Sequence, residues 1–558
     1  MTDETLLNRN LLALASRNPN LSREIGSAVK SDTIKMLLSK SGKIVPAIVK
    51  TGRELPLHSL FDPVKEGQKF SESYSGGGYL VFFGFGAGYH IHPFLKRKDI
   101  SNILIIDRDV SVFKELFSVM DFRNFILEPR ITFLVDMKPE SIKEYILSNY
   151  FPAITGDLQT ISLRSRFQTE NDYFTAAASA IKECLGVLAD DYTVQAYFGK
   201  KWFINSISNL KIAQTAATTL KPVRRALITG AGPSLEIQVD RIATLRKGGF
   251  LIATDTSLPS LMLYGLKPDL VISIDCQHIS YHHFLSGFPR DIPLVLDLAS
   301  PPDLTRLSEK VVFITSGHPF SQYLNTHWRK FPYIDISGGN VSHAAISLAD
   351  SLGAEEIYLF GTDFSFPEGK SYARGTYLYP YFQFREDKFR SLENQFFAFL
   401  LRNNHIVKDR IGDTIRYTTK PMISYKERLE QASGSLSSRI VPVPGKGVPL
   451  RVDEKSGLSR ARKVVHTIFS AGSPACDWKE FLTNYCKELE NLTPPEEPLA
   501  RYFRDLKSSE RDVWTTLFPA AAALRREHGS RGVNGIEILI EVKKWSQEVI
   551  RKQLVKTA

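Results

Sequence analysis

The stretch ALITGAGPSL, from Ala226 to Leu235, decides the predicted fold. Ala226 to Thr229 is a short apolar run with β-branched members, which is typical of a buried strand. Gly230 to Gly232 makes a sharp turn, and Pro233 and Ser234 open a helix, since proline suits the first helical turn. Free backbone N–H groups and the helix dipole make such a turn a ready anion site. The alternative is a tight turn with no ligand, because glycine-rich turns are common in α/β folds.

Apolar strands and helices alternate on both sides of this stretch. Five further strands are expected after the first helix, at 249–253, 270–274, 293–296, 311–315 and 357–360. This alternation predicts a parallel sheet that is covered on both faces. Ligands bind such sheets at the carboxyl ends of the strands, near the switch point of the strand order. Asp255, Asp275 and Asp363 follow strands, so we predict that they meet the first glycine turn at one edge.

A second glycine-rich turn lies in ISGGNVSHAAISLADSLGAEEIYLFGTDFSF. Gly338 and Gly339 precede an amphipathic helix, and Asn340 or Ser342 can cap its N-terminus. Two helix N-termini on one sheet edge can hold a diphosphate, or a phosphate and a sugar carboxylate. The predicted nucleotide-binding residues are therefore Gly230, Gly232, Pro233, Ser234, Asp255, Asp275, Gly338, Gly339, Asn340, Thr362 and Asp363.

The earlier stretch YLVFFGFGAGYHIHPFL predicts a second Rossmann-like domain. A strand over 80–83 is followed by a GxGxG turn of Gly84, Gly86 and Gly88, and a helix is expected after the turn. The next strand, 102–106, ends in Asp107, the position at which an acid holds ribose hydroxyls in dinucleotide folds. These residues predict a second nucleotide site, although many such turns serve only as scaffolds.

The chain of 558 residues is too long for one core. We predict an N-terminal Rossmann-like domain at 1–160, a helical connector at 161–220, a central nucleotide-binding domain at 221–430, a Ser/Pro/Gly linker at 431–450 and a helical C-terminal region at 451–558. The fold class is thus α/β, with parallel sheets in both Rossmann-like domains.

The net charge of +11 is spread along the chain, which disfavours a nucleic-acid partner. The four cysteines lack metal-ligand spacing and indicate reduced thiols in a cytoplasmic protein. No run of about eighteen apolar residues occurs, so no membrane span is expected. The first ten residues contain acids and no apolar segment, so a signal peptide is not expected either.

GAGPSL, the spaced ATD and SID, the YGLKPD between them and SGG…HAAISLADSLGAEEIYLFGTDF together resemble the MptE-like domain of the Maf motility-associated factors. That family consists of flagellin glycosyltransferases. The same motifs are similar to those of bacterial sialyltransferases with a single GT-A-like Rossmann domain. The resemblance implies a CMP-activated nonulosonic acid as donor and flagellin, or another protein, as acceptor. It also implies that Gly230, Gly232, Pro233 and Ser234 lie on the phosphate side.

The resemblance also implies catalytic residues. Tyr372, in KSYARG, matches a tyrosine near the reacting phosphate, and a phenol there assists the departing phosphate oxygen. We predict Tyr372 and Asp275 as catalytic residues. The sialyltransferase histidine base has no counterpart soon after this tyrosine. The remaining candidates are His278, His282, His283, His318, His343 and His405, and the alternative for each is a rim or packing residue.

Asp255 and Asp275 stand where the sialyltransferases have asparagines. Carboxylates beside a diphosphate suggest Mg²⁺ on Asp255, Asp275 and Asp363. Three functions follow from these residues. The first is transfer of a nonulosonic acid from a CMP donor to Ser or Thr of flagellin. The second is Mg²⁺-dependent pyrophosphoryl transfer from ATP to hydroxymethyl-dihydropterin, and the third is a non-catalytic scaffold that binds a nucleotide or flagellin.

Overall fold

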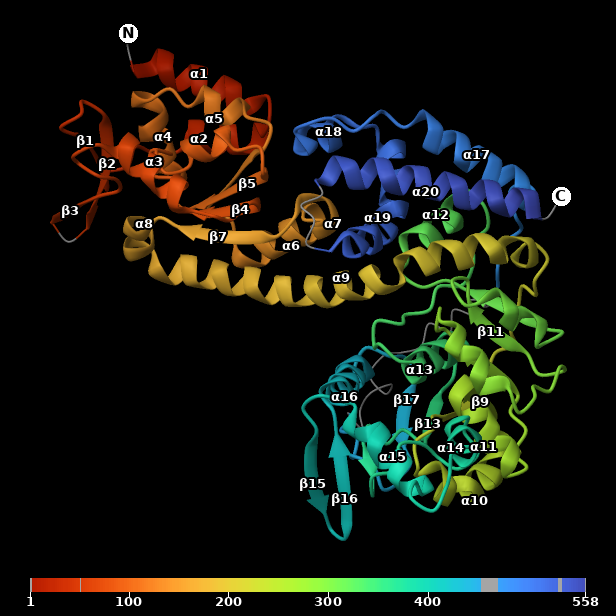
Figure 1. The fold of residues 1–558 in the computed structure, drawn as a ribbon. Helices are drawn as coiled ribbons and strands as arrows, with labels where there is room; N and C mark the ends of the chain where they lie inside the picture. The colour runs from red at the N-terminus through yellow and green to blue at the C-terminus, as the bar shows by residue number, and fades with distance from the viewer. Residues whose placement is uncertain (1–2, 51, 453–469, 530–533, 557–558) are drawn as a thin grey trace. The chain divides into compact units, whose positions relative to one another are not determined.

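The computed structural model describes residues 3–50, 52–452, 470–529 and 534–556, and these form two compact units (Figure 1). The N-terminal unit comprises the described residues of 1–199 and 489–546, and the central unit those of 200–488 and 547–558. The first crossing of the chain from one unit to the other falls within the helix α9 (Asn171–Ala213). It lies inside the region predicted as a helical connector.

A parallel sheet forms the centre of the N-terminal unit. Its strands, in the order β6-β5-β4-β7, are β6 (Ile131–Val135), β5 (Ile100–Asp107), β4 (Gly78–Phe83) and β7 (Leu158–Ser162). A small antiparallel sheet precedes it, made of β1 (Ile34–Leu38), β2 (Ile44–Lys50) and β3 (Arg53–Pro56). The described helices of this unit, besides its share of α9, are α1 (Asp3–Ala15), α2 (Pro19–Ser27), α3 (Pro63–Ser73), the 3-10 helix η1 (His92–Lys96), α4 (Val110–Val119), α5 (Arg123–Leu127), α6 (Pro139–Asn149), α7 (Pro152–Thr155), α8 (Arg164–Thr169), α18 (Leu499–Asp505), α19 (Ser508–His528) and most of α20 (Gly535–Lys556).

Both faces of this sheet are buried, as the continuous apolar strands predict. Leu80 and Phe82 of β4 pack into one core with side chains of α1, α4 and α5. Val81 and Phe83 point to the opposite face, where Phe174 of α9 joins a second core. The expected helix after the GxGxG turn is not formed, because Phe85 within the turn is fully buried in the first core and the chain continues through turns to η1.

From Trp478 onward the described part of the C-terminal region is helical, as predicted, with α17 (Trp478–Asn491) followed by α18, α19 and α20. Residues 453–469 of the predicted helical region lie outside the described residues. Residues 489–546 group with the N-terminal unit instead of forming a separate domain. Gly199 of α9 shows how closely they pack, because a Cβ atom built there would lie 1.8 Å from the carbonyl oxygen of Pro519 in α19. Among the described residues, no helix combines the length and apolar composition that a bilayer crossing requires.

The central unit is built on seven parallel strands in the order β12-β11-β10-β9-β8-β13-β17. They are β8 (Arg225–Thr229), β9 (Phe250–Thr254), β10 (Leu270–Ser273), β11 (Leu294–Asp297), β12 (Val311–Ile314), β13 (Glu356–Phe360) and β17 (Arg439–Pro442). The chain moves outward from β8 to β12 and then returns to β13 on the other side of β8. The switch point therefore lies between β8 and β13, where the two predicted glycine turns begin.

Helices cover this central sheet, and a small sheet extends to one side of it (Figure 1). The helices are α10 (Leu235–Leu245), η2 (Arg246–Gly248), η3 (Asp255–Ser257), α11 (Leu258–Leu263), η4 (His278–Phe284), η5 (Pro302–Arg306), α12 (Pro319–His327), α13 (Val341–Ser351), α14 (Leu378–Gln383), α15 (Leu392–Leu401) and α16 (Lys420–Ser433). The small antiparallel sheet has the order β14-β16-β15, with β14 (Phe366–Pro367), β15 (Val407–Ile411) and β16 (Thr414–Thr418).

The predicted linker at 431–450 is wrong. It holds the end of α16 and the strand β17, which pairs in parallel with β13 at the edge of the central sheet. Just after this strand, the carbonyl oxygens of Val443 and Pro444 accept hydrogen bonds from Gln238 of α10, and the N–H of Lys446 donates to the Ser234 hydroxyl oxygen. The sequence analysis missed this strand because prolines usually indicate a loop. Proline is nevertheless tolerated at the end of an edge strand, where its missing N–H has no partner to lose.

A buried histidine pair makes the N-terminal unit sensitive to acid. His58 accepts a hydrogen bond from the backbone N–H of Ala87 (2.9 Å), and burial lowers the pKa of His58 to about 4. In the unfolded chain this pKa is about 6.5, so below that pH the unfolded state takes up a proton that the folded state does not. Stability of the unit is therefore expected to fall by about 1.4 kcal/mol per pH unit between pH 6.5 and pH 4 from this group alone.

His58→Gln keeps an acceptor for Ala87 but removes the titration, so its stability should fall less over this range. Hydrogen exchange of β4 and β5 amides at a series of pH values measures the difference. His90 contacts His58 (5.4 Å between ring centres), and burial also lowers the pKa of His90, so the variant should retain part of the slope. Equal slopes in the wild type and the variant would contradict the assignment to His58.

Candidate functional site

The candidate site lies at the carboxyl edge of the central sheet, around the switch point. The turns after β8 and β13 are joined there by two hydrogen bonds. The N–H of Gly230 donates to the carbonyl oxygen of Phe360 (2.8 Å), and the N–H of Gly232 donates to that of Gly361 (2.8 Å). The carboxyl ends of β9 and β10 bring Asp255 and Asp275 to the same edge. The predicted convergence of these segments is therefore present.

The anion position at the first glycine turn holds a side chain of the protein itself, the Asp363 carboxylate. The backbone N–H of Ser234, at the start of α10, donates to Oδ2 of Asp363 (2.9 Å), and the Ser234 hydroxyl donates to Oδ1. The N–H of Lys446, in the segment after β17, donates to the Ser234 hydroxyl oxygen (2.6 Å). The carboxylate thus occupies the position at which a helix N-terminus attracts an anion. Nucleotide binding by Ser234 and Asp363 stays a prediction, and both residues are now bonded to other groups of the protein.

Only glycine at position 232 lets the Asp363 carboxylate approach the turn this closely. A Cβ atom at Gly232 would lie 2.1 Å from Oδ2 of Asp363 and 2.6 Å from the carbonyl oxygen of Gly361. Gly232→Ala is therefore expected to destabilise the central unit by about 1–3 kcal/mol, the usual cost of overpacking. Urea unfolding followed by hydrogen exchange of β8 would measure this loss. Gly248→Ala is the matched control, since the atom nearest to its Cβ would be 3.9 Å away; equal losses would contradict the steric role.

The second glycine turn keeps free donors. Asn340 caps α13, as predicted, by accepting the N–H of His343 on Oδ1 (3.1 Å). Among the described residues, the N–H groups of Val341 and Ser342 have no partner, as is usual in a first helical turn. A Cβ atom built on Gly230 would lie 3.4 Å from Oγ of Ser342, so the N-terminus of α13 reaches the turn after β8. The anion site left open at the switch point is that of α13, not that of α10.

Helix α16 adds a cation to this second turn. The Arg428 guanidinium donates to the carbonyl oxygen of Ser337 (3.2 Å). A Cβ atom on Gly339 would lie 2.7 Å from Cε1 of Tyr425, so the glycine allows the two segments to touch. The sequence reasoning missed Tyr425 and Arg428, because 85 or more residues separate them from the glycines and only the fold brings them together.

Two carboxylates lie at the ends of β9 and β10. Asp255 is buried and accepts the hydroxyl of Ser273 on Oδ2 (2.7 Å) and the N–H of Thr256 on Oδ1 (2.7 Å). Asp275 accepts the N–H of Gln277 (2.9 Å). Burial raises the pKa of Asp275, and the negative charge of Asp255 adds to this rise.

An imidazole and two phenols surround these carboxylates. The ring centre of His283, in η4, lies 4.8 Å from that of Tyr377, and its Nε2 is 3.5 Å from the Thr256 hydroxyl. Its Nδ1 is buried without a hydrogen-bond partner among the described residues. Burial raises the pKa of Tyr372 to about 12, and the nearby Tyr377 and Asp255 also raise it. Tyr372 therefore keeps its proton at neutral pH and can act as a donor.

The candidate histidines lie in different parts of the central unit, and only some of them are near the site. His278 is exposed near Asp303, His318 stacks on Trp202 (3.9 Å between ring centres), and His405 is exposed before β15. His343 packs against the second glycine turn, and burial lowers its pKa. His282 is exposed and lies further from Tyr377 than His283 does, at 6.3 Å. Of these, only His283 lies with Tyr372 and the two carboxylates.

The predicted metal triad is not assembled. Asp363 is held by Ser234, whereas Asp255 and Asp275 lie with His283. Within the described ranges, no group of three or more His, Cys, Asp or Glu side chains has an arrangement that would hold a metal ion. A neighbouring cavity of about 500 Å³, lined by Pro259, Met262, Phe288 and Gly375 among others, is mainly apolar.

In the N-terminal unit, the predicted second nucleotide site is filled by side chains. Asp107 is buried and accepts two bonds from the guanidinium of Arg166 (2.6 and 3.0 Å) and one from the N–H of Phe85 (2.7 Å). Cβ atoms at Gly84 and Gly86 would lie 2.8 Å from Arg166 and 2.5 Å from His58. These glycines make room for protein atoms, so a ribose contact by Asp107 stays a prediction that needs Arg166 to move.

Comparisons with known proteins agree with the domain and the fold. The family described as 6-hydroxymethylpterin diphosphokinase MptE-like matches residues 200–369. An uncharacterized protein of Treponema pallidum (strain Nichols) is 33% identical over 172 residues, which are 30% of this chain and 80% of that protein. A second one is 33% identical over 153 residues, 27% of this chain and 54% of its own length.

A solved structure extends the similarity to the rest of the chain. The MAf glycosyltransferase from Magnetospirillum magneticum AMB-1 matches 99% of this chain and 96% of its own, with a TM-score of 0.57 and 15% identity. At this identity the match concerns the fold. The resemblance to Maf proteins with a central MptE-like domain is thus confirmed in the domain and in the fold.

Proposed function

Because this chain carries an MptE-like domain and belongs to the same family as its Treponema pallidum relative, with the fold of a Maf glycosyltransferase, we propose that it is a glycosyltransferase. The proposed donor is a CMP-activated nonulosonic acid, and the proposed acceptor is a Ser or Thr hydroxyl of flagellin. The observation that carries the proposal is the grouping of His283, Tyr372 and Asp275 at the carboxyl edge of the sheet, the edge at which Ser342 of α13 reaches the turn after β8.

The α13 N-terminus is the proposed phosphate site. Its free N–H groups at Val341 and Ser342 supply hydrogen bonds, and the helix dipole and Arg428 supply positive charge. The α10 turn would then act as a scaffold that fixes the edge of the sheet. This differs from the role that the resemblance implies for Gly230, Gly232, Pro233 and Ser234, which would need Asp363 to withdraw.

The proposed chemistry is a single displacement. The acceptor oxygen forms a bond to the anomeric carbon as the bond from that carbon to the CMP phosphate oxygen breaks. The acceptor hydroxyl gives its proton to His283, whose Nδ1 has no partner among the described residues. Tyr372, kept protonated by its raised pKa of about 12, donates a hydrogen bond to the departing phosphate. Asp275 helps to orient and stabilise the protonated imidazole.

Mass spectrometry tests the proposal directly. Purified protein, a CMP-nonulosonic acid and unmodified flagellin are expected to yield CMP and flagellin heavier by one sugar. Tyr372→Phe should lower kcat by about 10²-fold or more with little change in KM, because the lost hydrogen bond forms mainly in the transition state. Tyr381→Phe is the control, an exposed tyrosine of α14. No CMP release from folded protein would overturn the proposal.

The same assay separates the two other candidate functions. The family description of the central domain favours the pyrophosphokinase, which would release AMP from ATP when hydroxymethyl-dihydropterin is added. The closed GAGPS turn favours the scaffold, which would bind CMP or flagellin without turnover. AMP release that depends on the pterin would establish the first of these, and binding without CMP release would establish the second.

A further inference from the structure

The N-terminal unit contains a cavity of about 1000 Å³ that the proposed transfer does not use. Residues from four segments line it: 42–44 at the start of β2, 64–74 in and just after α3, 87–97 with η1, and 120–125 before and within α5. This volume is at the upper end of the range for small-molecule sites. The cavity adjoins the GxGxG turn, since Ala87 and Gly88 belong to its lining.

Several aromatic side chains line the cavity, and we call Phe122, Phe125 and Tyr89 its aromatic floor. Phe122 and Phe125 are buried, and a Cβ atom on Gly88 would lie 2.8 Å from Cζ of Phe125, so the turn approaches this ring closely. The His92 ring stands edge-on to Phe125, with 5.8 Å between ring centres. Tyr89 adds a further ring to the lining. Such a surface suits a flat ring, because aromatic pairs gain energy beyond the burial of area.

The cavity lining also carries cations. Lys43 and Lys96 line the cavity, and their ammonium groups have no hydrogen bond or ion pair among the described residues. Arg97 is different, because it is bound to Asp99 and to the carbonyl oxygen of Tyr74 (2.7 Å). Two unpaired ammonium groups that line the same cavity as these aromatic rings favour an anion that is attached to a ring.

The cavity lining also contains an acidic side chain and a backbone N–H donor. Glu72 of α3 has no partner within the described ranges, so its carboxylate can accept hydroxyl or amino groups of a ligand. The backbone N–H of Tyr89 also lacks a partner among the described residues. A nucleoside monophosphate carries every matching part: a flat base, ribose hydroxyls and a doubly charged phosphate.

We propose that this cavity binds a nucleoside monophosphate, or the nucleoside phosphate part of a larger metabolite. The base lies on the floor formed by Phe122, Phe125 and Tyr89, and the phosphate lies between Lys43 and Lys96. The ligand uses the face of the GxGxG turn at Ala87 and Gly88. Asp107 lies outside it, since its carboxylate belongs to Arg166.

Hydrogen exchange of the full chain tests this site separately from the central one. CMP and AMP, each at about 1 mM, are expected to protect amides in 64–74 and 87–97. Cytidine and ribose 5-phosphate should each bind about tenfold more weakly, because one lacks the anion and the other the ring. Protection confined to the central unit would overturn the proposal and leave the transferase intact.

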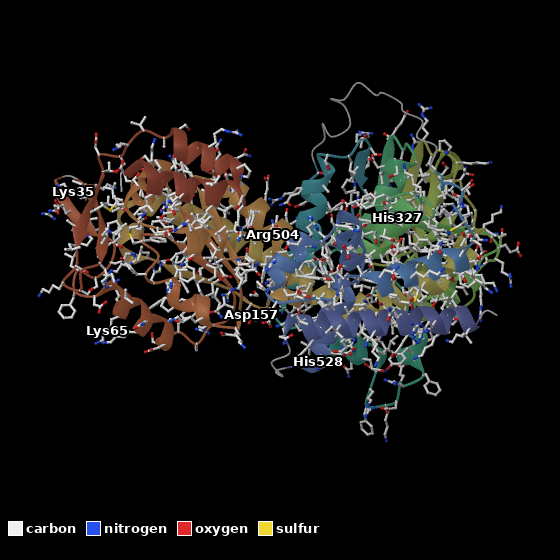
Figure 2. All side chains as sticks on the ribbon, turned by 90° about the horizontal axis from the view of Figure 1, so that it is seen from above. Lys35, Lys65, Asp157, His327, Arg504 and His528 are labelled. Atoms are coloured by element: carbon white, nitrogen blue, oxygen red, sulfur yellow. The ribbon has the colours of Figure 1, made fainter. Side chains whose placement is uncertain are left out.

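Two surface variants of α3 supply the matched pair. Gln68 is exposed and lines the cavity, so Gln68→Trp should fill it and abolish the protection. Lys65 is exposed on the same helix but does not line the cavity, so Lys65→Trp should have no effect (Figure 2).

Lys43→Gln with Lys96→Gln should weaken binding of CMP about tenfold and leave that of cytidine unchanged. Equal protection in Gln68→Trp and the wild type would contradict the site.

Discussion

Replacing His283 by glutamine is expected to lower the rate of sugar transfer by about 10²–10⁴-fold, the usual contribution of a general base. Glutamine has a similar length but cannot take up a proton at neutral pH. The loss should appear in kcat, with KM for the donor nearly unchanged, because the base acts on the acceptor hydroxyl in the transition state. Steady-state CMP release and flagellin mass provide the two measurements.

His282→Gln is the matched control for this prediction. The two histidines are neighbours in η4, but His282 is exposed and its ring lies 6.3 Å from that of Tyr377, against 4.8 Å for His283. Only the His283 variant should lose transfer. If both variants retain full activity, another group takes the acceptor proton, and His283 has a packing role.

Patterns within a few residues predicted the fold well. The run Ala226–Thr229 with its glycine turn gave β8 and the start of α10, and similar runs gave β9 to β13 close to their bounds. These signals are local, because a buried parallel strand is apolar over its whole length. β17 was missed, since its four residues lie in a proline-rich stretch and are identified as a strand only by pairing with β13.

The chemistry of the candidate site was less predictable. Asp363 follows a strand, as a ligand-binding acid would, yet its partner Ser234 lies 129 residues away and no local pattern indicates that pair. The same holds for Asp107 and Arg166, which are 59 residues apart. Among six candidate histidines, only the packing of η4 against η3 distinguishes His283. Residue type and position after a strand predicted where the site lies. Contacts between residues far apart in the sequence decide which of its polar atoms are free to bind a ligand.

Replacing Arg166 by methionine is expected to destabilise the N-terminal unit by about 3–5 kcal/mol, because it leaves a buried carboxylate without its partner. Arg166 and Asp107 are 2% and 3% exposed at their side chains, so water cannot take the place of the guanidinium. Methionine fills most of the volume of the arginine side chain, so the loss of stability measures the effect of removing the positive charge. Hydrogen exchange of β4 and β5 is the suitable measurement, since a chain of two units need not unfold in a single transition.

A double variant separates the charge from the fold. Asp107→Asn removes the unpaired charge yet keeps an oxygen that can accept the N–H of Phe85 or Arg108, the two amides that Asp107 now serves. Combined with Arg166→Met, it should therefore recover part of the stability that the single variant loses. Arg123→Met, which breaks an exposed pair with Asp121, should cause no resolvable loss. If the double variant is less stable than Arg166→Met alone, then Asp107 serves mainly to bind the backbone of the GxGxG turn, and its charge is compensated by those N–H groups rather than by the guanidinium.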